Sequence, residues 1–398
     1  GNCPMNALSQ DDPNDKMIID RLLSNPELKN QPELHIHIVV PNEFQPIAKY
    51  NIGITAGLEA TVCPPEWIQG MNRMNMNIVP SNFVNDVFKS CIFDVKDDKT
   101  QQIKGQLNCE KPMEVLFEGT DTNIFKKTKE FSKELVDGMK NIEEPFNFLY
   151  VGHWLSGNLG EDRKDTGMML KIFLETFKNM KKKPGLIMKT SGAGFSILDR
   201  EDILKKINHI KSTIKGDLPN IYLIHGDFTD EEMNELYNHP KVKAHVNITH
   251  GEGFGRPLLE ASISEKPIIA SDWSGHKDFL TKGLANLISG RLSDVPKNSF
   301  PKNMYVQGTQ WFTANYQDVS FTMKDIYKSY KKYTLNAKKL GMVNKSKFSL
   351  DAMTQKLGKI LDKYVPEFPK EVELKLPKLK KVGDTAPAKI KLPKLKKV

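Results

Sequence analysis

The chain has 398 residues, 39% hydrophobic and 27% charged, which is typical of a soluble globular protein with room for two domains. No apolar run approaches the roughly 18 residues that suggest a membrane span, and the polar first segment predicts no signal peptide. The four cysteines are widely spaced and form no metal-like pair, so we expect a reduced, cytoplasmic protein.

The net charge of +9 suggests an acidic partner, but most of it lies at the end of the chain. Residues 366–398 hold ten lysines against four acidic residues, a net charge of +6, which leaves only +3 for the remaining chain. The body therefore does not resemble a basic nucleic-acid-binding domain. Within the tail, the octapeptide KLPKLKKV occurs at 375–382 and again at 391–398.

Lysine-rich segments broken by proline are usually disordered, so we expect the tail to be a mobile basic arm. Such an arm would contact a polyanion or an anionic membrane and hold the protein at its periphery. A solvated tail without a partner and an added edge strand remain the alternatives.

The first part of the chain predicts an α/β domain after the polar segment 1–34. The expected strands are 35–40, 50–56, 77–80 and 115–117, and the expected helices begin at Trp67, span 83–89 and span 126–139. Ser81 or Asn82 is the expected cap of the second helix. Residues 141–145 form the expected linker to the next domain.

The second part alternates strands and helices more regularly. Strands are expected at 148–152, 185–189, 221–225 and 244–248, with helices at 166–180, 199–214, 230–237 and from Pro257, followed by terminal helices at 321–340 and 348–364. This alternation indicates parallel sheets, whose ligands bind at the carboxyl ends of the strands. One rim of the sheet would then hold Arg163, Lys164, Lys189, His225, Glu252 and Glu260.

The stretch His250–Ala261, HGEGFGRPLLEA, carries the clearest chemical signal. Its three glycines allow tight turns and close approach to a ligand, and Pro257 suits the first turn of a helix. A helix N-terminus behind such a loop favours an anion such as phosphate. Glu252 and Glu260 could accept hydrogen bonds from sugar and ribose hydroxyls. The plainer alternative is an ordinary strand–loop–helix joint.

Seven residues separate Glu252 from Glu260, with Gly-Phe-Gly-Arg-Pro between them. This pattern resembles the E-x7-E motif of group 1 retaining glycosyltransferases, the GT-B family that includes glycogen and sucrose synthases. Residues 266–272 resemble the strand and donor-side loop that follow in that family. Residues 118–125 resemble its "NGVD…F" segment, with Glu118 in place of the usual Asn. The resemblance covers about residues 113–285, is weak over 1–60 and is absent from the tail.

The resemblance implies the GT-B fold: two Rossmann-like domains whose parallel sheets face a central cleft. Residues 1–143 would form the acceptor-side domain, 144–320 the nucleotide-sugar domain and 321–365 helices that pack back across both, with 366–398 as the tail. The expected opening strand and glycine-rich loop are not obvious in residues 1–34, which predicts a truncated or divergent start.

The implied activity is retaining transfer of a sugar from a UDP- or GDP-linked donor to an acceptor hydroxyl. By this resemblance Glu252 is the catalytic-site residue that holds the donor sugar, and Glu260 binds the ribose. No nucleophile is named, because front-face attack assisted by the leaving phosphate is the favoured account for the family.

The resemblance also suggests that Arg163 and Lys164 clamp the diphosphate, assisted by the backbone around Gly253, Phe254 and Gly255. The family normally spaces its Arg and Lys several residues apart, whereas here they are adjacent. Lys189 could supply the second charge, and a solvated Arg-Lys pair is the structural alternative.

No D-x-D triplet occurs in the sequence, which argues against a metal-bridged donor, and we expect neither a metal nor a cofactor. Four histidines fall near the proposed site and could act as acid, base or phosphate contact, or serve structure alone: His153, His225, His250 and His276.

The alternatives are a GT-B sugar-nucleotide epimerase, a phosphorylase and a non-catalytic sugar- or nucleic-acid-binding protein on the same scaffold. A phosphorylase would need a pyridoxal lysine site, which we do not find. The acceptor stays open among surface polysaccharide, lipid-linked sugar, protein and modified DNA.

Overall fold

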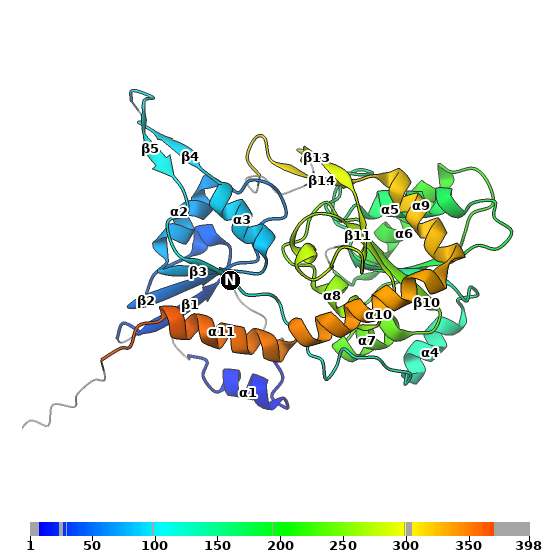
Figure 1. Ribbon diagram of the computed structural model, residues 1–398, viewed down its shortest axis with the longest axis horizontal. Helices are drawn as coiled ribbons and strands as arrows, with labels where there is room; N and C mark the ends of the chain where they lie inside the picture. Colours follow the sequence, from blue (N-terminus) through cyan, green and yellow to red (C-terminus); the bar gives the residue numbers. More distant parts are fainter. Residues whose placement is uncertain are drawn as a thin grey trace, which may run out of the picture. The chain divides into compact units, whose positions relative to one another are not determined.

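The computed structural model describes residues 8–23, 27–28, 30–97, 99–192, 194–297, 299 and 305–369. The chain divides after Val365 into two units, and the helices and strands given below lie in the first. That unit is α/β with two parallel sheets, as the alternation of strands and helices predicts (Figure 1). Among the described residues, no helix is long and apolar enough to cross a membrane. The predicted basic arm lies outside the described residues except for 366–369.

The first sheet has four parallel strands in the order β1-β2-β3-β6. They are β1 (Leu34–Ile38), β2 (Tyr50–Ile54), β3 (Met76–Val79) and β6 (Met113–Val115). One face is covered by α2 (Pro65–Arg73) and α3 (Asn82–Ser90), whose Trp67, Met71, Val84 and Phe88 form a core with Val79. The short helices α1 (Pro13–Ile19) and η2 (Pro41–Glu43) precede them in the chain.

The second sheet has six parallel strands in the order β12-β11-β10-β7-β8-β9. They are β7 (Asn147–His153), β8 (Gly185–Ser191), β9 (Ile221–Ile224), β10 (Val242–Asn247), β11 (Ile268–Ser271) and β12 (Asn286–Ile288). Numbered within the sheet, this is the dinucleotide-binding order 3-2-1-4-5-6 read from β9. The strand order reverses between β7 and β10, so the loops after these two strands border the expected ligand position.

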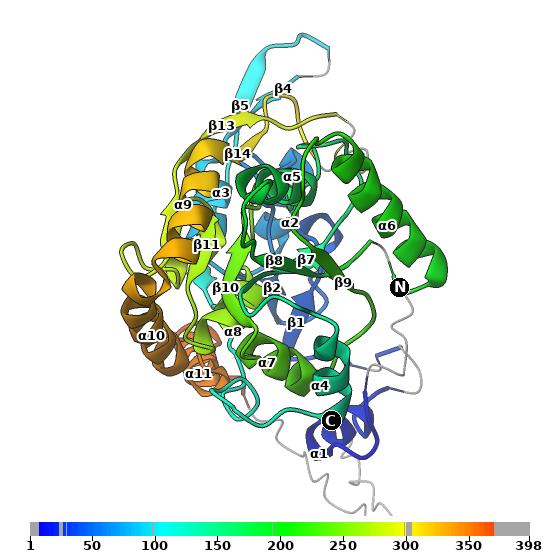
Figure 2. The same ribbon diagram turned by 90° about the vertical axis from the view of Figure 1, so that its right-hand side faces the viewer.

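Helices cover both faces of the second sheet (Figure 2). One face carries α5 (Thr166–Phe177), α6 (Ile197–Ser212) and α9 (Tyr316–Lys328), and the other carries α4 (Lys133–Lys140), α7 (Asp230–Asn238) and α8 (Arg256–Ile263). Successive residues of a strand alternate between the two cores, so Phe148 and Tyr150 pack with α5 whereas Leu149 packs with α7. Both faces of the strands are therefore buried, which explains their nearly continuous apolar runs.

The last part of the chain begins with η3 (Gly275–Asp278), which follows β11. An antiparallel pair, β13 (Gly290–Asp294) and β14 (Gln310–Ala314), comes before α9, α10 (Tyr330–Lys347) and α11 (Leu350–Tyr364). Helix α11 packs on the face of the first sheet opposite α2 and α3, where Ile360 joins Ile52, Met76 and Ile78. The same helix end places Lys363 and Tyr364 on the Glu114 carboxylate, each at 2.8 Å.

Two helix predictions were wrong in extent. The helix predicted over 126–139 begins only at Lys133, because side chains of α7 hold the preceding backbone: Asn234 accepts from the Lys126 N–H and Asn238 from the Thr128 N–H. The single helix predicted over 321–340 is interrupted at Ser329, whose φ and ψ of −124° and 36° end α9 before α10 begins.

Candidate functional site

The glycine-rich stretch lies where the sequence predicts, between the buried strand β10 and helix α8. Gly255 caps α8 with φ at +94°, a conformation that glycine adopts without strain, and Pro257 lies in the first turn. The loop is packed tightly from behind, because a Cβ on Gly275 would lie 1.9 Å from the Gly253 carbonyl oxygen. The Glu252 backbone is fixed at both ends, since its N–H donates to Ser274 Oγ at 2.9 Å and its carbonyl accepts from the Gly275 N–H.

The two predicted cations meet the first glutamate. Glu252 is 6% exposed, its Oε1 is paired with the buried Lys164 ammonium, and its Oε2 lies 3.8 Å from Arg163. Arg163 also donates to the Gly251 carbonyl at 3.1 Å and pairs with Glu59 at 3.0 Å. Burial alone would raise the pKa of Glu252, but Lys164 and Arg163 outweigh it and hold that pKa below its ordinary value. The carboxylate is therefore ionised at neutral pH.

The second glutamate of the motif has different partners. Glu260 lies one turn into α8, where Oε1 accepts from Arg256 Nε at 2.7 Å and Oε2 from the Tyr237 hydroxyl at 3.4 Å. Burial raises the pKa of Glu260 to about 7, despite the nearby Arg256 charge. Arg256 was not among the predicted site residues, although its i,i+4 spacing from Glu260 within one helix favours an ion pair.

Glu118 links the surroundings of the two motif glutamates. Burial raises its pKa, the Arg256 charge opposes that effect and the Glu252 charge adds to it. The Glu118 carboxylate thus lies within electrostatic range of Glu252 and of Arg256, the partner of Glu260. It occupies the position at which the family segment has Asn, so this site carries one acidic group more than the resemblance implies.

Lys189 lies at the carboxyl end of β8, but its ammonium is already bonded. It donates to the Gly226 carbonyl at 2.7 Å and lies 4.9 Å from the centre of the Phe228 ring and 5.6 Å from that of Phe195. Burial lowers its pKa. Its side chain therefore reaches the loop after β9, whereas Arg163 and Lys164 reach Glu252.

Three of the four candidate histidines, His153, His225 and His276, bond to neighbouring residues of the fold. His153 lies 3.1 Å from Ser191 Oγ and His225 lies 2.8 Å from the Asp199 carboxylate. The buried His276 bonds the Ser271 carbonyl through Nε2 at 2.7 Å. Burial lowers the pKa of His153, and the charges of Lys164, Arg163 and Lys189 lower it further, which places this ring within range of all three cations.

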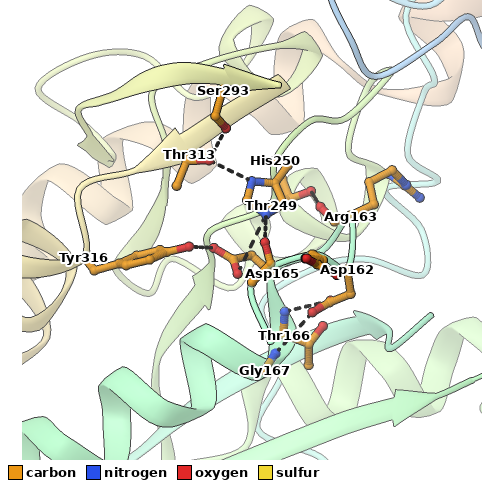
Figure 3. Close-up of polar contacts among 12 residues, drawn as sticks. Asp162, Arg163, Asp165, Thr166, Gly167, Thr249, His250, Ser293, Thr313 and Tyr316 are labelled. Carbon is orange, nitrogen blue, oxygen red and sulfur yellow. Dashed lines mark hydrogen bonds and ion pairs between the residues drawn. The ribbon is translucent and has the colours of Figure 1, made fainter. Parts of the chain in front are cut away.

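A buried polar network fixes the loop that carries Arg163 and Lys164 (Figure 3). Asp162 accepts the Thr166 N–H at 2.9 Å and so anchors the loop to the start of α5. The Arg163 carbonyl accepts from Thr249 Oγ1 at 3.1 Å and from the His250 N–H at 2.9 Å. These bonds join the loop after β7 directly to the loop after β10, across the point where the strand order reverses.

His250 and Asp165 belong to the same buried network and link it to β14 and to Tyr316 of α9. The His250 ring stacks on Trp311 at 4.2 Å and lies between the carbonyls of Phe312 and Gly160, at 2.6 and 3.2 Å. Asp165 has φ at +51° and accepts from the Tyr316 hydroxyl at 2.9 Å (Figure 3). Burial raises the pKa of Asp165 to about 8, which favours its neutral form.

The segments that follow β2 and β3 of the first sheet also contact the glycine loop. Ser81 caps α3 by accepting the Val84 N–H, as predicted, and its hydroxyl also donates to the Gly253 carbonyl at 2.6 Å. A Cβ on Gly253 would lie 2.6 Å from the Ala56 carbonyl oxygen, and one on Gly251 would lie 2.5 Å from the carbonyl oxygen of Glu59. Glu59 and this second role of Ser81 could not be predicted from the sequence, because no local pattern marks contacts between distant residues; Ser81 and Gly253 are 172 positions apart.

No protein-family model and no curated protein sequence matches the chain. Solved structures do match. HepE from Anabaena, solved with UDP and glucose, has a TM-score of 0.54 and 13% identity over 79% of this chain and 72% of its own. Trehalose-6-phosphate synthase OtsA has a TM-score of 0.56 and 11% identity over 84% and 73%. Sucrose-phosphate synthase from Thermosynechococcus elongatus has a TM-score of 0.52 and 12% identity over 79% and 68%. These similarities show that the chain has the GT-B fold predicted from its sequence.

Proposed function

We propose that the chain is a glycosyltransferase that moves a sugar from a UDP- or GDP-linked donor to an acceptor hydroxyl. The observation that carries the proposal is the buried cluster of Arg163, Lys164 and Glu252 at the reversal of strand order, beside the N-terminus of α8. UDP with glucose, and UDP-glucose, are bound in the two HepE structures, which have the same fold as this chain.

The cluster suits a departing diphosphate. Arg163 and Lys164 supply two positive charges in a water-poor position, and the start of α8 at Phe254 and Gly255 adds backbone N–H groups and a favourable dipole. A diphosphate bound there would compete with Glu252 for the Lys164 ammonium. The freed carboxylate could then accept hydrogen bonds from the donor sugar.

The nucleoside would extend toward the second glutamate. Glu260 offers a carboxylate oriented by Arg256, and in the proposed role it accepts bonds from the ribose hydroxyls. Lys189 remains a secondary candidate, because it would first have to leave the Gly226 carbonyl. Transfer with retention of the anomeric configuration, without a metal or a further cofactor, is part of the proposal. It rests on the Glu252–Glu260 spacing and on the absence of a D-x-D triplet from the sequence.

The proposal is tested with a panel of UDP- and GDP-linked sugars, in buffer with a chelator and in buffer with Mg²⁺, followed by mass and NMR identification of the products. We expect one donor to release its nucleoside diphosphate equally well in both buffers. Glu252→Gln should abolish release, whereas Glu134→Gln, on the exposed face of α4, should not change it.

The products separate the competing functions. A transferred or hydrolysed sugar with the donor's anomeric configuration supports a retaining transferase. A donor sugar changed at one carbon would identify an epimerase instead. Nucleotide binding without consumption of any donor in the panel would favour the non-catalytic alternative.

A further inference from the structure

Helix α10 presents a face whose chemistry the proposed function does not use. Its 18 residues, Tyr330–Lys347, include six lysines and no acidic residue. Four of its residues are buried: Ala337, Leu340, Gly341 and Asn344. They face α8, where Asn344 Nδ2 donates to Ser262 Oγ at 2.8 Å and a Cβ on Gly341 would meet the Ser262 carbonyl at 2.7 Å (Figure 1).

The opposite face carries a mixed stripe of lysines and large apolar side chains. Residues spaced by three or four positions share one face of a helix, and the stripe consists of Lys331, Leu335, Lys338, Met342 and Lys345. All five are exposed, Leu335 to 62% and Met342 to 61%. In the part of the chain that the structure describes, no carboxylate forms an ion pair with any of the three lysines.

We propose that this stripe docks the protein on an anionic lipid surface. Leu335 and Met342 lie two turns apart, so both can enter the acyl boundary together, while the flanking lysines extend to lipid phosphates and carboxylates. A bare acidic polymer would use the lysines but would gain nothing from two exposed apolar side chains. The helix also contains no Arg, the residue best shaped for nucleic-acid phosphates. The charge and the apolar pair together favour lipid over nucleic acid.

The contact would hold α8 at a fixed distance from the membrane, since α10 packs on it directly. It is a different contact from the one expected of the tail, because its residues belong to the folded unit and include the apolar pair. It also does not depend on the proposed sugar transfer, as none of its side chains lies in the donor site.

The test uses the full chain and flotation with vesicles of phosphatidylcholine containing about 30% phosphatidylserine, at a salt concentration near physiological. The variant Lys331→Gln/Lys338→Gln/Lys345→Gln should bind about a hundredfold more weakly, because each of the three lysines near the surface adds roughly a factor of five. The matched control replaces Lys205, Lys211 and Lys215, on or just after α6, and should bind as the wild type does.

A second variant, Leu335→Ser/Met342→Ser, keeps the charge and separates lipid from nucleic acid. It should weaken vesicle binding about tenfold or more and leave binding to duplex DNA unchanged. Wild-type vesicle binding by both variants would overturn the proposal. So would loss of DNA binding in the lysine variant together with unchanged vesicle binding in the apolar variant, which would identify a nucleic-acid surface. Circular dichroism and the unfolding midpoint establish that the variants are folded.

Discussion

At the scale of single residues, the site depends on charges that are buried but paired. Glu252, Lys164 and Arg163 are all largely shielded from water, and each has a partner of opposite charge: Glu252 pairs with Lys164 and Arg163, and Arg163 pairs also with Glu59. Burial lowers the pKa of an arginine, yet Glu59 and Glu252 outweigh that effect and raise the pKa of Arg163. Removing one member of such a cluster leaves its partner as an unpaired buried charge, which destabilises the folded state.

Replacing Glu252 should therefore affect stability as well as turnover. In Glu252→Gln the Lys164 ammonium loses its ion-pair partner, and we expect the free energy of unfolding to fall by about 3 kcal/mol. The double variant Glu252→Gln/Lys164→Met should recover much of that loss, because no unpaired ammonium remains. Urea unfolding measures both. Asp137→Asn, which breaks the exposed Lys140–Asp137 pair, is the control and should cost less than about 1 kcal/mol. Equal midpoints for Glu252→Gln and the wild type would contradict the expectation.

Glu260 should make stability depend on pH near neutrality. Its pKa is about 7 in the folded protein against an ordinary value of 4.5, so the folded state holds this proton between those pH values and the unfolded state does not. The free energy of unfolding therefore falls as pH rises through this range, by about 3 kcal/mol at most from this group. Glu260→Gln removes the contribution.

The difference between wild type and Glu260→Gln isolates this group, because other titrating residues such as Asp165 affect both proteins equally. Denaturant unfolding at several pH values between about 4.5 and 7 should show the wild type losing stability relative to the variant as pH rises. Parallel curves for the two proteins would mean that the pKa of Glu260 is not raised.

At the scale of elements, the glycine loop and η3 depend on close backbone contact. Gly275→Ala would place a Cβ 1.9 Å from the Gly253 carbonyl oxygen and 2.9 Å from that of Glu252, so the loop must move. We expect a loss of about 2–3 kcal/mol in the free energy of unfolding and weaker nucleotide binding. Gly358→Ala, within α11 where no atom lies within 4 Å of the new Cβ, should instead stabilise by up to about 1 kcal/mol. Thermal unfolding and nucleotide titration of both variants test the contrast; a neutral Gly275→Ala would refute it.

The elements that could be predicted from sequence are those whose signal is local. Buried parallel strands such as β7 and β10 appear as apolar runs, and the spacing of Glu252 and Glu260 is fixed within one strand–loop–helix unit. The hairpin β4 (Phe93–Lys96) and β5 (Ile103–Leu107) was missed because its residues are mostly polar or exposed and alternate weakly. The late start of α4 was missed because tertiary hydrogen bonds from α7 decide it.

At the scale of the whole molecule, the site uses both parallel sheets. The second sheet supplies the cations and the glycine loop, and the segments after β2 and β3 supply Glu59 and Ser81. The position of the cations and of the glycine loop could be predicted from the sequence, since each directly follows a predicted strand of one parallel sheet. The contacts of Glu59 and Ser81 join residues far apart in the chain, and the periodicity of a sequence carries no information on such contacts. This is why Arg163, Lys164 and Glu252 were predicted to lie together, whereas their partners from the first part of the chain were not.

The last prediction concerns removal of residues 366–398. The hydrophobic clusters of the described residues draw their members from Leu34 to Val365, and α11 ends at Tyr364. A chain cut after Val365 should therefore unfold at the same urea concentration as the full chain and consume the same donor at the same rate. It also loses a net charge of +6, so its binding to heparin or duplex DNA at low salt should weaken and depend less steeply on salt. A full-length variant with the ten tail lysines changed to Gln is the control for charge alone. An unfolding midpoint at a lower urea concentration in the cut chain would show that the tail contributes to the folded core. Polyanion binding equal to that of the full chain would show that charges outside residues 366–398 bind the polyanion.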